Sequence, residues 1–457
     1  MLREVKVENG IVRGVASSDP RVTSFKGIPY AAPPVGKNRW RAPQPAADWE
    51  GVLLCQEFAP ISMQDQPGVG EDVYCKEWHV DPDIPMDEDC LYLNVWTPAK
   101  SADEKLPVLV WYFGGAFQWG YTAEMEFDGE RLARRGIVVV SVNYRLAVMG
   151  FLAHPEITKE NPDAPANFGL LDQKAGLNWV YRNIAAFGGD PEKITIAGQS
   201  AGGGSTMQQL TCPDNKDIVK GAVILSGMID MDGQTGDIFN PLTLEEAEKN
   251  GEAFFDFIGV KSLEEARAID AAKIRDLYGE YSPMNFAPDS PPDLSKKMFP
   301  IIDGKTYLGN PLRLIEEGKY PDVPVITGYT SDEFTFGGVN VVEKSVKSAV
   351  SKAIECGKAE GKDRRFYCYC FDPSIPGEDN PGTFHSVDLW FWFESIQKCW
   401  RPFKGKHFDL ARQMCNYFAN FVKTGDPNGL DADGTEMPRW ETFDADKKEV
   451  LRLTEDK

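Results

Sequence analysis

A serine nucleophile is the first chemical feature that the sequence suggests. Ser200 stands at the centre of a Gly-Gln-Ser-Ala-Gly pentapeptide over 198–202, which follows a β-branched run and precedes a helical pattern. A Gly-x-Ser-x-Gly turn between a strand and a helix exposes the serine hydroxyl on a sharp, strained turn, where any Cβ two residues away would collide with neighbouring backbone. We therefore predict that Ser200 attacks an electrophilic carbon.

A serine hydroxyl is a poor nucleophile unless an imidazole takes its proton. The chain has four histidines. His79 lies in an acidic loop, His154 precedes a proline, and His407 begins a helical pattern. His385 differs, because it lies in a loop beyond a late expected strand and downstream of Ser200, the chain order of a serine and its base in one known class of triad. We predict that His385 is the base.

The acid that orients this base should lie between Ser200 and His385 in the chain and directly after a strand. An expected strand over 323–328 is followed by two acidic residues, Asp332 and Glu333. Spacing alone does not rank two adjacent loop residues. At this point either carboxylate could hold the imidazole in the required tautomer.

Acyl transfer also needs backbone N–H groups that point at the developing oxyanion. The strand expected over 107–113 ends in Gly114-Gly115-Ala116-Phe117. Small residues allow the chain to turn its amides inward, as the early strand-to-helix loop does in enzymes with a Gly-x-Ser-x-Gly nucleophile turn. Gly115, Ala116 and the residue after the nucleophile, Ala201, are the predicted donors.

Positioning these groups requires a sheet whose strands end near one another. Apolar β-rich runs alternate with helical segments such as 170–187, which predicts a mostly parallel sheet covered by helices on both faces. Two acidic, Ala-rich helical patterns over 244–258 and 263–278, with a Pro-rich stretch after them, predict a lid-like insert over about 242–292 in one catalytic domain, 1–457. The remaining expected strands cover 91–97, 137–143, 193–198, 221–225 and 364–371.

Composition excludes several classes of partner. The formal net charge is −21, and so acidic a surface repels nucleic acid and anionic lipid headgroups. The longest apolar stretches are shorter than the ~18 to 20 residues that span a bilayer.

The start of the chain alternates apolar and charged residues as a first strand does. Nine cysteines, an odd number without a metal-type pair, indicate reduced thiols. We expect a cytoplasmic protein.

Several motifs occur in an order that resembles the type-B carboxylesterase and cholinesterase family of α/β hydrolases, and short bacterial carboxylesterases most of all. The resemblance covers nearly the whole chain and implies the α/β-hydrolase fold, a central mostly parallel sheet flanked by helices, with no metal or organic cofactor. Besides the Ser200 elbow, the similar segments are 25–31, 33–36, 88–96, 142–146, 167–173 and 187–191.

The resemblance assigns roles that the residues alone leave open. It selects Glu333 over Asp332, because the family's acid is the Glu of an Asp-Glu-Gly element, although Phe334 replaces the glycine here. It makes Ser226 a serine beside the triad, and it matches His385, which is followed by Ser386 where members commonly have Gly. It also places Cys90 at one half of the disulfide of extracellular members, whose other half would fall over 61–64, where this chain has no cysteine.

The leading hypothesis is a bacterial serine esterase that hydrolyses small-molecule carboxylic esters through an acyl-enzyme. An alternative is a feruloyl or other aromatic-acyl esterase, because four aromatic residues flank the site loops, although such residues are more often core. A non-catalytic binding protein on the same fold is the third possibility, and the intact triad argues against it. The four aromatic residues are Trp119, Trp390, Trp392 and Phe393.

Overall fold

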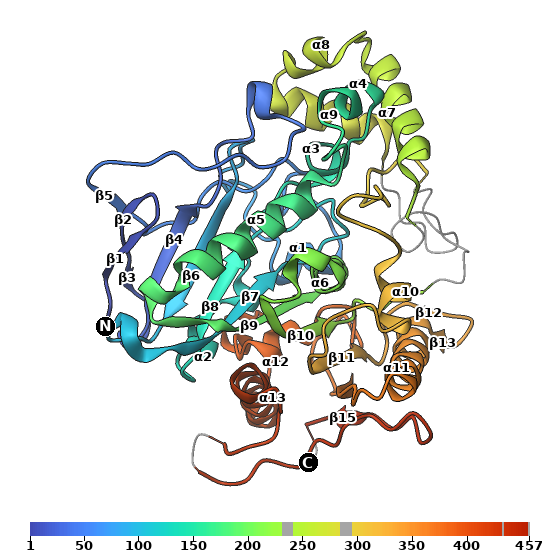
Figure 1. Cartoon of the computed structure of the whole chain (residues 1–457). Coiled ribbons are helices and arrows are strands. Elements are labelled where there is room, and N and C mark those ends of the chain that lie inside the picture. The colour runs from blue at the N-terminus through green and yellow to red at the C-terminus, as the bar shows by residue number, and fades with distance from the viewer. Residues whose placement is uncertain (231–240, 284–294, 432–433, 456–457) are drawn as a thin grey trace.

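The structure is a computed structural model that describes residues 1–230, 241–283, 295–431 and 434–455. Its centre is a ten-stranded sheet in the order β15-β14-β11-β10-β9-β7-β8-β6-β4-β3 (Figure 1). The strands of the sheet are β3 (Val15–Ala16), β4 (Thr23–Pro29), β6 (Tyr92–Thr97), β7 (Leu106–Tyr112), β8 (Val138–Val142), β9 (Gly189–Gln199), β10 (Val219–Leu225), β11 (Val325–Thr330), β14 (Phe366–Phe371) and β15 (Leu451–Leu453).

In the order given, all strands from β15 through β9 and β7 to β8 are parallel to one another, whereas β6 is antiparallel to both β8 and β4. β9 lies between β7 and β10 and pairs with both in parallel. Parallel strands place their carboxyl ends at the same edge of a sheet, where open α/β folds bind ligands. The loops after β7, β9, β10 and β11, and the segment beyond β14, therefore start from one edge. The predicted strands were correct to within a few residues at each end.

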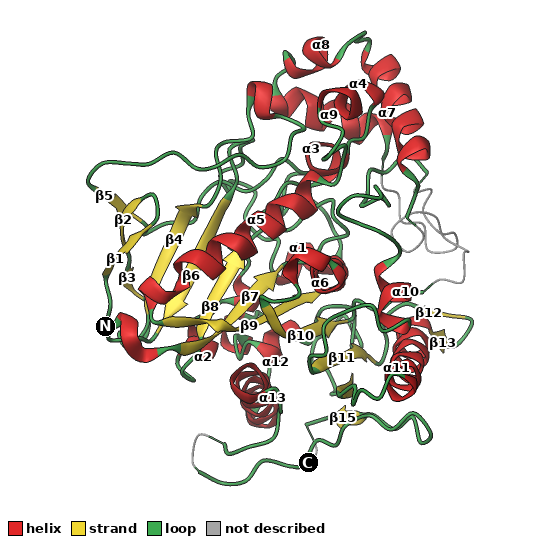
Figure 2. Ribbon diagram, viewed as in Figure 1, coloured by secondary structure: helices red, strands yellow, loops and turns green. Residues whose placement is uncertain are grey.

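Helices cover both faces of the sheet, as Figure 2 shows. α5 (Phe168–Asn183), α6 (Ala201–Thr211) and α11 (Val341–Ala359) pack in one apolar cluster with Ile194 and Ile196 of β9. α13 (Gly405–Thr424) packs in the other cluster with Ala197 of β9. Side chains alternate between the two faces of a strand, so β9 is buried on both sides. This burial fixes the position of the turn that follows it.

The insert lies away from the sheet, at the top of Figure 1. It contains α7 (Leu244–Ile258), α8 (Leu263–Arg267) and α9 (Ala271–Tyr281). The single helix expected over 263–278 was therefore wrong, because it divides in two. Asp270 causes the division by capping α9: its carboxylate accepts hydrogen bonds from the N–H groups of Ala272 and Lys273. Most of the expected Pro-rich stretch falls in 284–294, outside the described residues.

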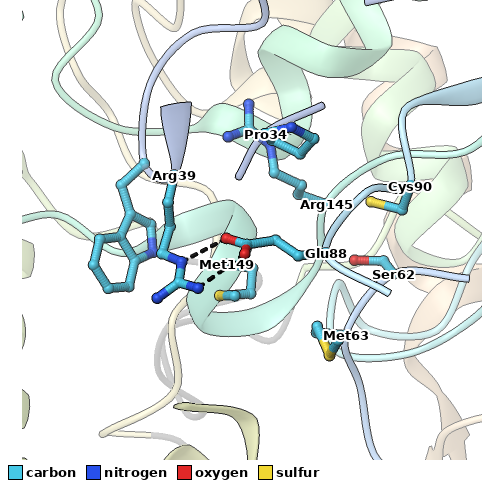
Figure 3. A pocket seen from close by; sticks show the side chains of 9 residues that line it. Pro34, Arg39, Ser62, Met63, Glu88, Cys90, Arg145 and Met149 are labelled. Carbon is cyan, nitrogen blue, oxygen red and sulfur yellow. Dashed lines mark hydrogen bonds and ion pairs between the residues drawn. The ribbon is translucent and has the colours of Figure 1, made fainter. Parts of the chain in front are cut away.

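Arg39 fastens the insert to the body of the protein. Its buried guanidinium binds the Glu88 carboxylate, with Nη2 2.8 Å from Oε2, and Nη1 donates to the carbonyl of Ile269 between α8 and α9 at 2.6 Å. Figure 3 shows this ion pair beside Arg145 and the buried thiol of Cys90. Arg145 forms its own buried ion pair with Asp172 of α5. Because each buried charge has a partner of opposite sign, neither ion pair leaves an unpaired charge in the interior.

The smaller elements complete the frame. Within the described ranges, no helix combines the length and the apolar character needed to cross a membrane. All nine cysteines are described and carry free thiols. The other strands are β1 (Glu4–Val7), β2 (Gly10–Arg13), β5 (Val52–Leu54), β12 (Thr335–Phe336) and β13 (Val339–Asn340); the other helices are α1 (Val73–Glu77), α2 (Glu130–Ala133), α3 (Ala147–Phe151), α4 (Pro155–Glu160), α10 (Pro311–Glu316) and α12 (Leu389–Trp392).

Candidate active site

Ser200 lies on the turn between β9 and α6, in a backbone conformation that side chains rarely adopt (φ 57°, ψ −124°). The turn is tight enough to require both glycines of the pentapeptide. A Cβ on Gly198 would lie 2.1 Å from the Gly202 carbonyl oxygen, and one on Gly202 would lie 2.1 Å from the Tyr112 carbonyl oxygen. The Ser200 N–H donates to the Leu225 carbonyl at 2.9 Å. Ser200 is half-buried, so its side chain retains solvent access.

Glu333 and His385 come together from the loop after β11 and the loop beyond β14. His385 Nδ1 forms a short hydrogen bond with Glu333 Oε2. The other oxygen of Glu333, Oε1, accepts the Ser226 hydroxyl at 2.8 Å and the Thr330 N–H at 2.9 Å. The carboxylate is fully buried and each oxygen has a partner. Such an arrangement fixes both the direction of the carboxylate and the tautomer of the imidazole.

Asp332, the other candidate acid, makes different contacts. Its carboxylate Oδ2 accepts the Thr383 N–H at 2.8 Å and the Thr383 hydroxyl at 3.0 Å, and the residue is exposed. Thr383 precedes His385 by two residues, so Asp332 joins the acid's loop to the base's loop. The structure therefore brings Glu333, and not Asp332, to the imidazole.

The two positions where this chain lacks the family's glycine both have left-handed backbone. Phe334 has φ 41° and Ser386 has φ 80°, a region that glycine adopts with the least strain. The Phe334 ring centroid lies 4.6 Å from that of His385. The substitutions thus keep the backbone shape that glycine would favour, and Phe334 adds an apolar contact to the base.

Nε2 of His385, the nitrogen that would take the serine proton, lies 3.3 Å from Nε2 of Gln199, the residue before the nucleophile. Among the described residues, no hydrogen bond joins the Ser200 hydroxyl to His385. The bond between nucleophile and base is often long or poorly aligned until a substrate binds. The backbone of His385 has a further partner, because the Tyr74 hydroxyl donates to the His385 carbonyl at 3.2 Å.

The predicted oxyanion loop follows β7 and turns through successive left-handed residues, Gly115 (φ 105°), Ala116 (φ 51°) and Phe117 (φ 57°). It lies against the nucleophile, since a Cβ on Gly114 would be 3.2 Å from the Cβ of Ser200. In the described part of the chain, the N–H groups of Gly115, Ala116 and Ala201 have no hydrogen-bond acceptor. They are available to an oxygen placed beside the serine.

Asp388 is a buried acid near the site that the sequence analysis missed. It lies three residues after His385. Its Oδ2 accepts the Tyr369 hydroxyl at 2.8 Å and the indole N–H of Trp392 at 3.1 Å, and its Oδ1 has no partner among the described residues. Burial, and next the charge of Glu333, raise the pKa of Asp388 to about 6. An acidic residue three positions after His385, shortly before the aromatic run 390–393, was the available signal.

Three of the four aromatic residues behind the aromatic-acyl alternative belong to the core. Trp390, Trp392 and Phe393 have no exposed surface. Trp390 packs edge-on against Trp78, with ring centroids 6.0 Å apart. Trp119 is half-buried. Of the four, only Trp119 retains surface with which a ligand could make contact.

The remaining histidines have other contacts. Nε2 of His79 lies 3.0 Å from Oε1 of Glu124. His154 caps α4, because its Nδ1 accepts the Glu156 N–H at 3.2 Å. His407 Nε2 lies 3.0 Å from the Ser374 carbonyl oxygen. Of the four histidines, only His385 lies beside the serine turn.

Comparison with known proteins gives a family model and several relatives. The model described as Carboxylesterase family matches residues 2–356 and 346–457. A cholinesterase of Mus musculus is 36% identical over 523 residues, covering 99% of this chain and 83% of that protein. A para-nitrobenzyl esterase of Bacillus subtilis is 30% identical over 497 residues, covering 98% and 94%. A fumonisin B1 esterase of Sphingopyxis macrogoltabida is 35% identical over 328 residues, 71% of this chain but only 55% of that protein.

Solved structures agree with these matches. A PNB esterase superposes with a TM-score of 0.79 at 27% identity, covering 100% of this chain and 97% of that one. A carboxylesterase of Geobacillus stearothermophilus at pH 6.8 superposes with a TM-score of 0.78 at 26% identity, covering 99% and 96%. These similarities confirm the predicted α/β-hydrolase fold.

Proposed function

Because the chain belongs to the carboxylesterase family and is therefore a carboxylic ester hydrolase acting on small-molecule esters, we propose that Ser200, His385 and Glu333 carry out its reaction. The contact between His385 Nδ1 and Glu333 is the observation that supports this assignment most strongly. It joins two residues 52 positions apart, and it pairs the imidazole with a buried carboxylate that has a partner on each oxygen, beside the strained turn that carries Ser200.

In the proposed reaction the Ser200 oxygen attacks the ester carbonyl carbon while His385 Nε2 takes the hydroxyl proton. The C–O bond to the alcohol then breaks, and the same nitrogen returns the proton to the departing alcohol oxygen. Water repeats the sequence on the acyl-enzyme: His385 takes its proton, the acid is released, and Ser200 regains its hydrogen. Glu333 stabilises the imidazolium that forms in each half-reaction.

The negative charge on the carbonyl oxygen would be met by the N–H groups of Gly115, Ala116 and Ala201. Their lack of acceptors within the described chain supports this role. Removing one such donor typically costs roughly 2.7 to 4 kcal/mol of transition-state stabilisation. Ser226 has a different part in the proposal, because it donates to Glu333 and positions the acid without contacting the substrate.

Replacing Ser200 with alanine tests the proposal directly. We expect the turnover of p-nitrophenyl butyrate to fall by roughly 10⁴-fold or more while the circular dichroism spectrum is unchanged, because only binding and oxyanion stabilisation remain. Ser205→Ala is the matched control: Ser205 lies in the same helix, α6, and its hydroxyl donates to the Ala201 carbonyl. It should keep activity within about tenfold. Normal turnover by Ser200→Ala would disprove the assignment.

We further propose that 1–457 forms one catalytic domain with a helical insert over about 242–292, which the run of sheet strands from residue 15 to residue 453 supports. The free thiols are compatible with the predicted cytoplasmic location. The aromatic-acyl alternative stays a prediction, now with only Trp119 to support it. Comparing the turnover of p-nitrophenyl butyrate with that of methyl ferulate would decide between the two substrate classes.

A further inference from the structure

A pocket of about 240 Å³ lies between α9 of the insert and the body of the protein. Arg275 and Tyr278 of α9 line one side, Gln118 and Ala147 line another, and Lys297 lines a third. Nothing in the proposed reaction uses this pocket. Its size suits part of a small organic molecule.

The pocket adjoins the oxyanion loop. Gln118 follows Ala116 by two residues, a span of at most about 7 Å even in extended chain. The Gln118 side chain accepts the Tyr278 hydroxyl at 3.1 Å and donates to the Met298 carbonyl at 3.0 Å. Gln118 therefore connects the oxyanion loop to α9 and to the segment that contains Lys297. The pocket is therefore next to the loop that contacts Ser200.

Lys297 is the unusual group in this pocket. The residue is buried, with a relative exposure of 6%. Among the described residues its ammonium has no hydrogen bond or ion pair, and its one recorded contact is the face of the Tyr278 ring at 5.2 Å. Burial lowers the pKa of this ammonium. A buried cation without a directly bound counter-ion is costly, and part of this cost is recovered when an anion binds.

The other charges of the pocket lie nearer its rim. Arg275 is half-buried, and its guanidinium binds the exposed carboxylate of the adjacent Asp276. Asp65 is exposed, and its charge favours the protonated form of Lys297. The most buried charged group of the pocket is therefore a cation, on a protein whose net charge is −21. A local cation of this kind would select an anionic group that the rest of the surface repels.

We propose that Lys297 binds a free carboxylate on the substrate, so that the enzyme prefers esters that carry a second, unesterified carboxyl group. This inference rests on the proposed function, because it needs the ester itself to lie at Ser200. The carboxylate fits by chemistry: its oxygens accept the three N–H donors of the ammonium, and it supplies the missing counter-charge.

Three p-nitrophenyl or aryl esters test the proposal. p-Nitrophenyl butyrate is neutral, mono-p-nitrophenyl glutarate carries the carboxylate on its acyl side, and 4-butyryloxybenzoate carries it on its alcohol side. In Lys297→Gln we expect kcat/KM for at least one charged ester, relative to the neutral ester, to fall roughly tenfold or more. Lys296→Gln is the matched control: the residue is adjacent and exposed, and its ammonium lies 5.0 Å from the Tyr281 ring centroid. It should leave both ratios within about twofold.

The neutral ester separates the two proposals. If Lys297→Gln hydrolyses it normally and both charged-to-neutral ratios are unchanged, the carboxylate site is disproved while the triad stands. Free glutarate provides the remaining arm: if it alters neutral-ester turnover through Lys297 while neither ratio changes, the pocket binds a separate anion and the substrate proposal fails. Should Lys297→Gln not fold, Lys297→Met, which keeps the apolar stem, gives the same comparison.

Discussion

Two buried carboxyl groups lie close to the base, and they differ in how their oxygens are used. Glu333, in the loop after β11, has partners on both oxygens: the imidazole on one, and the Ser226 hydroxyl and the Thr330 N–H on the other. Asp388, before α12, has two donors on Oδ2 and none on Oδ1 among the described residues. Both groups are buried, but in the described part of the chain only Glu333 receives hydrogen bonds on both carboxyl oxygens.

Because both groups are buried, this difference lies in the hydrogen bonds that each carboxyl group receives. Donors around a carboxylate replace the water that it loses, whereas an oxygen without a donor makes the charged form costly. Asp388 accordingly has a pKa raised to about 6. Glu333 contacts the base directly, and Asp388 lies behind it. Three predictions test this distinction.

Glu333→Gln should have the largest effect, a loss of kcat of roughly 10³- to 10⁴-fold. The Gln oxygen must stay with the donors of Ser226 and Thr330, so its NH₂ would face His385 Nδ1. That contact favours the tautomer with hydrogen on Nε2, which cannot accept the serine proton. Asp332→Asn is the control, because an amide oxygen still accepts from Thr383, and its loss should stay below about tenfold. Steady-state kinetics on p-nitrophenyl butyrate measures both losses of kcat. Equal losses in the two variants would contradict the assignment of Glu333 as the acid.

Asp388→Asn should change how stability depends on pH. The raised pKa means that the folded protein holds this proton more tightly than the unfolded chain between about pH 4 and pH 6. The wild-type free energy of unfolding therefore falls as pH rises through that window, by about 3 kcal/mol from this group. The variant lacks this contribution, so its stability relative to wild type should rise across the window. Urea unfolding at several pH values measures the difference. Parallel curves would show that Asp388 does not titrate there.

Ser226→Ala should have the smallest effect of the three, a loss of kcat of roughly tenfold. Glu333 keeps the Thr330 N–H and the imidazole but loses one donor, so the acid is held less firmly. Tyr369→Phe removes the corresponding donor from Asp388 and should leave kcat within about threefold, because that carboxyl does not contact His385. Measuring kcat of the two variants side by side shows whether losing the Ser226 donor costs more activity than losing the Tyr369 donor. A larger kcat loss in Tyr369→Phe would contradict the separation of roles.

The frame of the site could be predicted because it rests on local signals. The strand before Ser200 is β-branched and buried on both faces, and the glycines at 198 and 202 are required by contacts of 2.1 Å that no side chain could avoid. By contrast, the break between α8 and α9 depends on Asp270 acting as a cap within an otherwise helical pattern. Spacing does not distinguish a capping Asp from an exposed helical one.

The parts that spacing and residue type alone could not predict depend on contacts between distant segments. The choice of Glu333 over Asp332 is determined by Ser226, 107 positions upstream, and by Thr383, 51 positions downstream. Lys297 resembles the exposed Lys296 in sequence, and only the packing of α9 over Gln118 makes one of them buried. Charge and spacing give no indication of which lysine lies inside.

The left-handed backbone at Ser200 sets stability and activity against each other. A non-glycine residue held in such a region costs about 1 to 3 kcal/mol, which glycine would largely avoid. Selection for thermal stability alone would therefore favour glycine at position 200 and produce a more stable protein that lacks the nucleophile. A programme of directed evolution on this chain must screen for turnover at every round, since at position 200 the stabilising change ends the reaction.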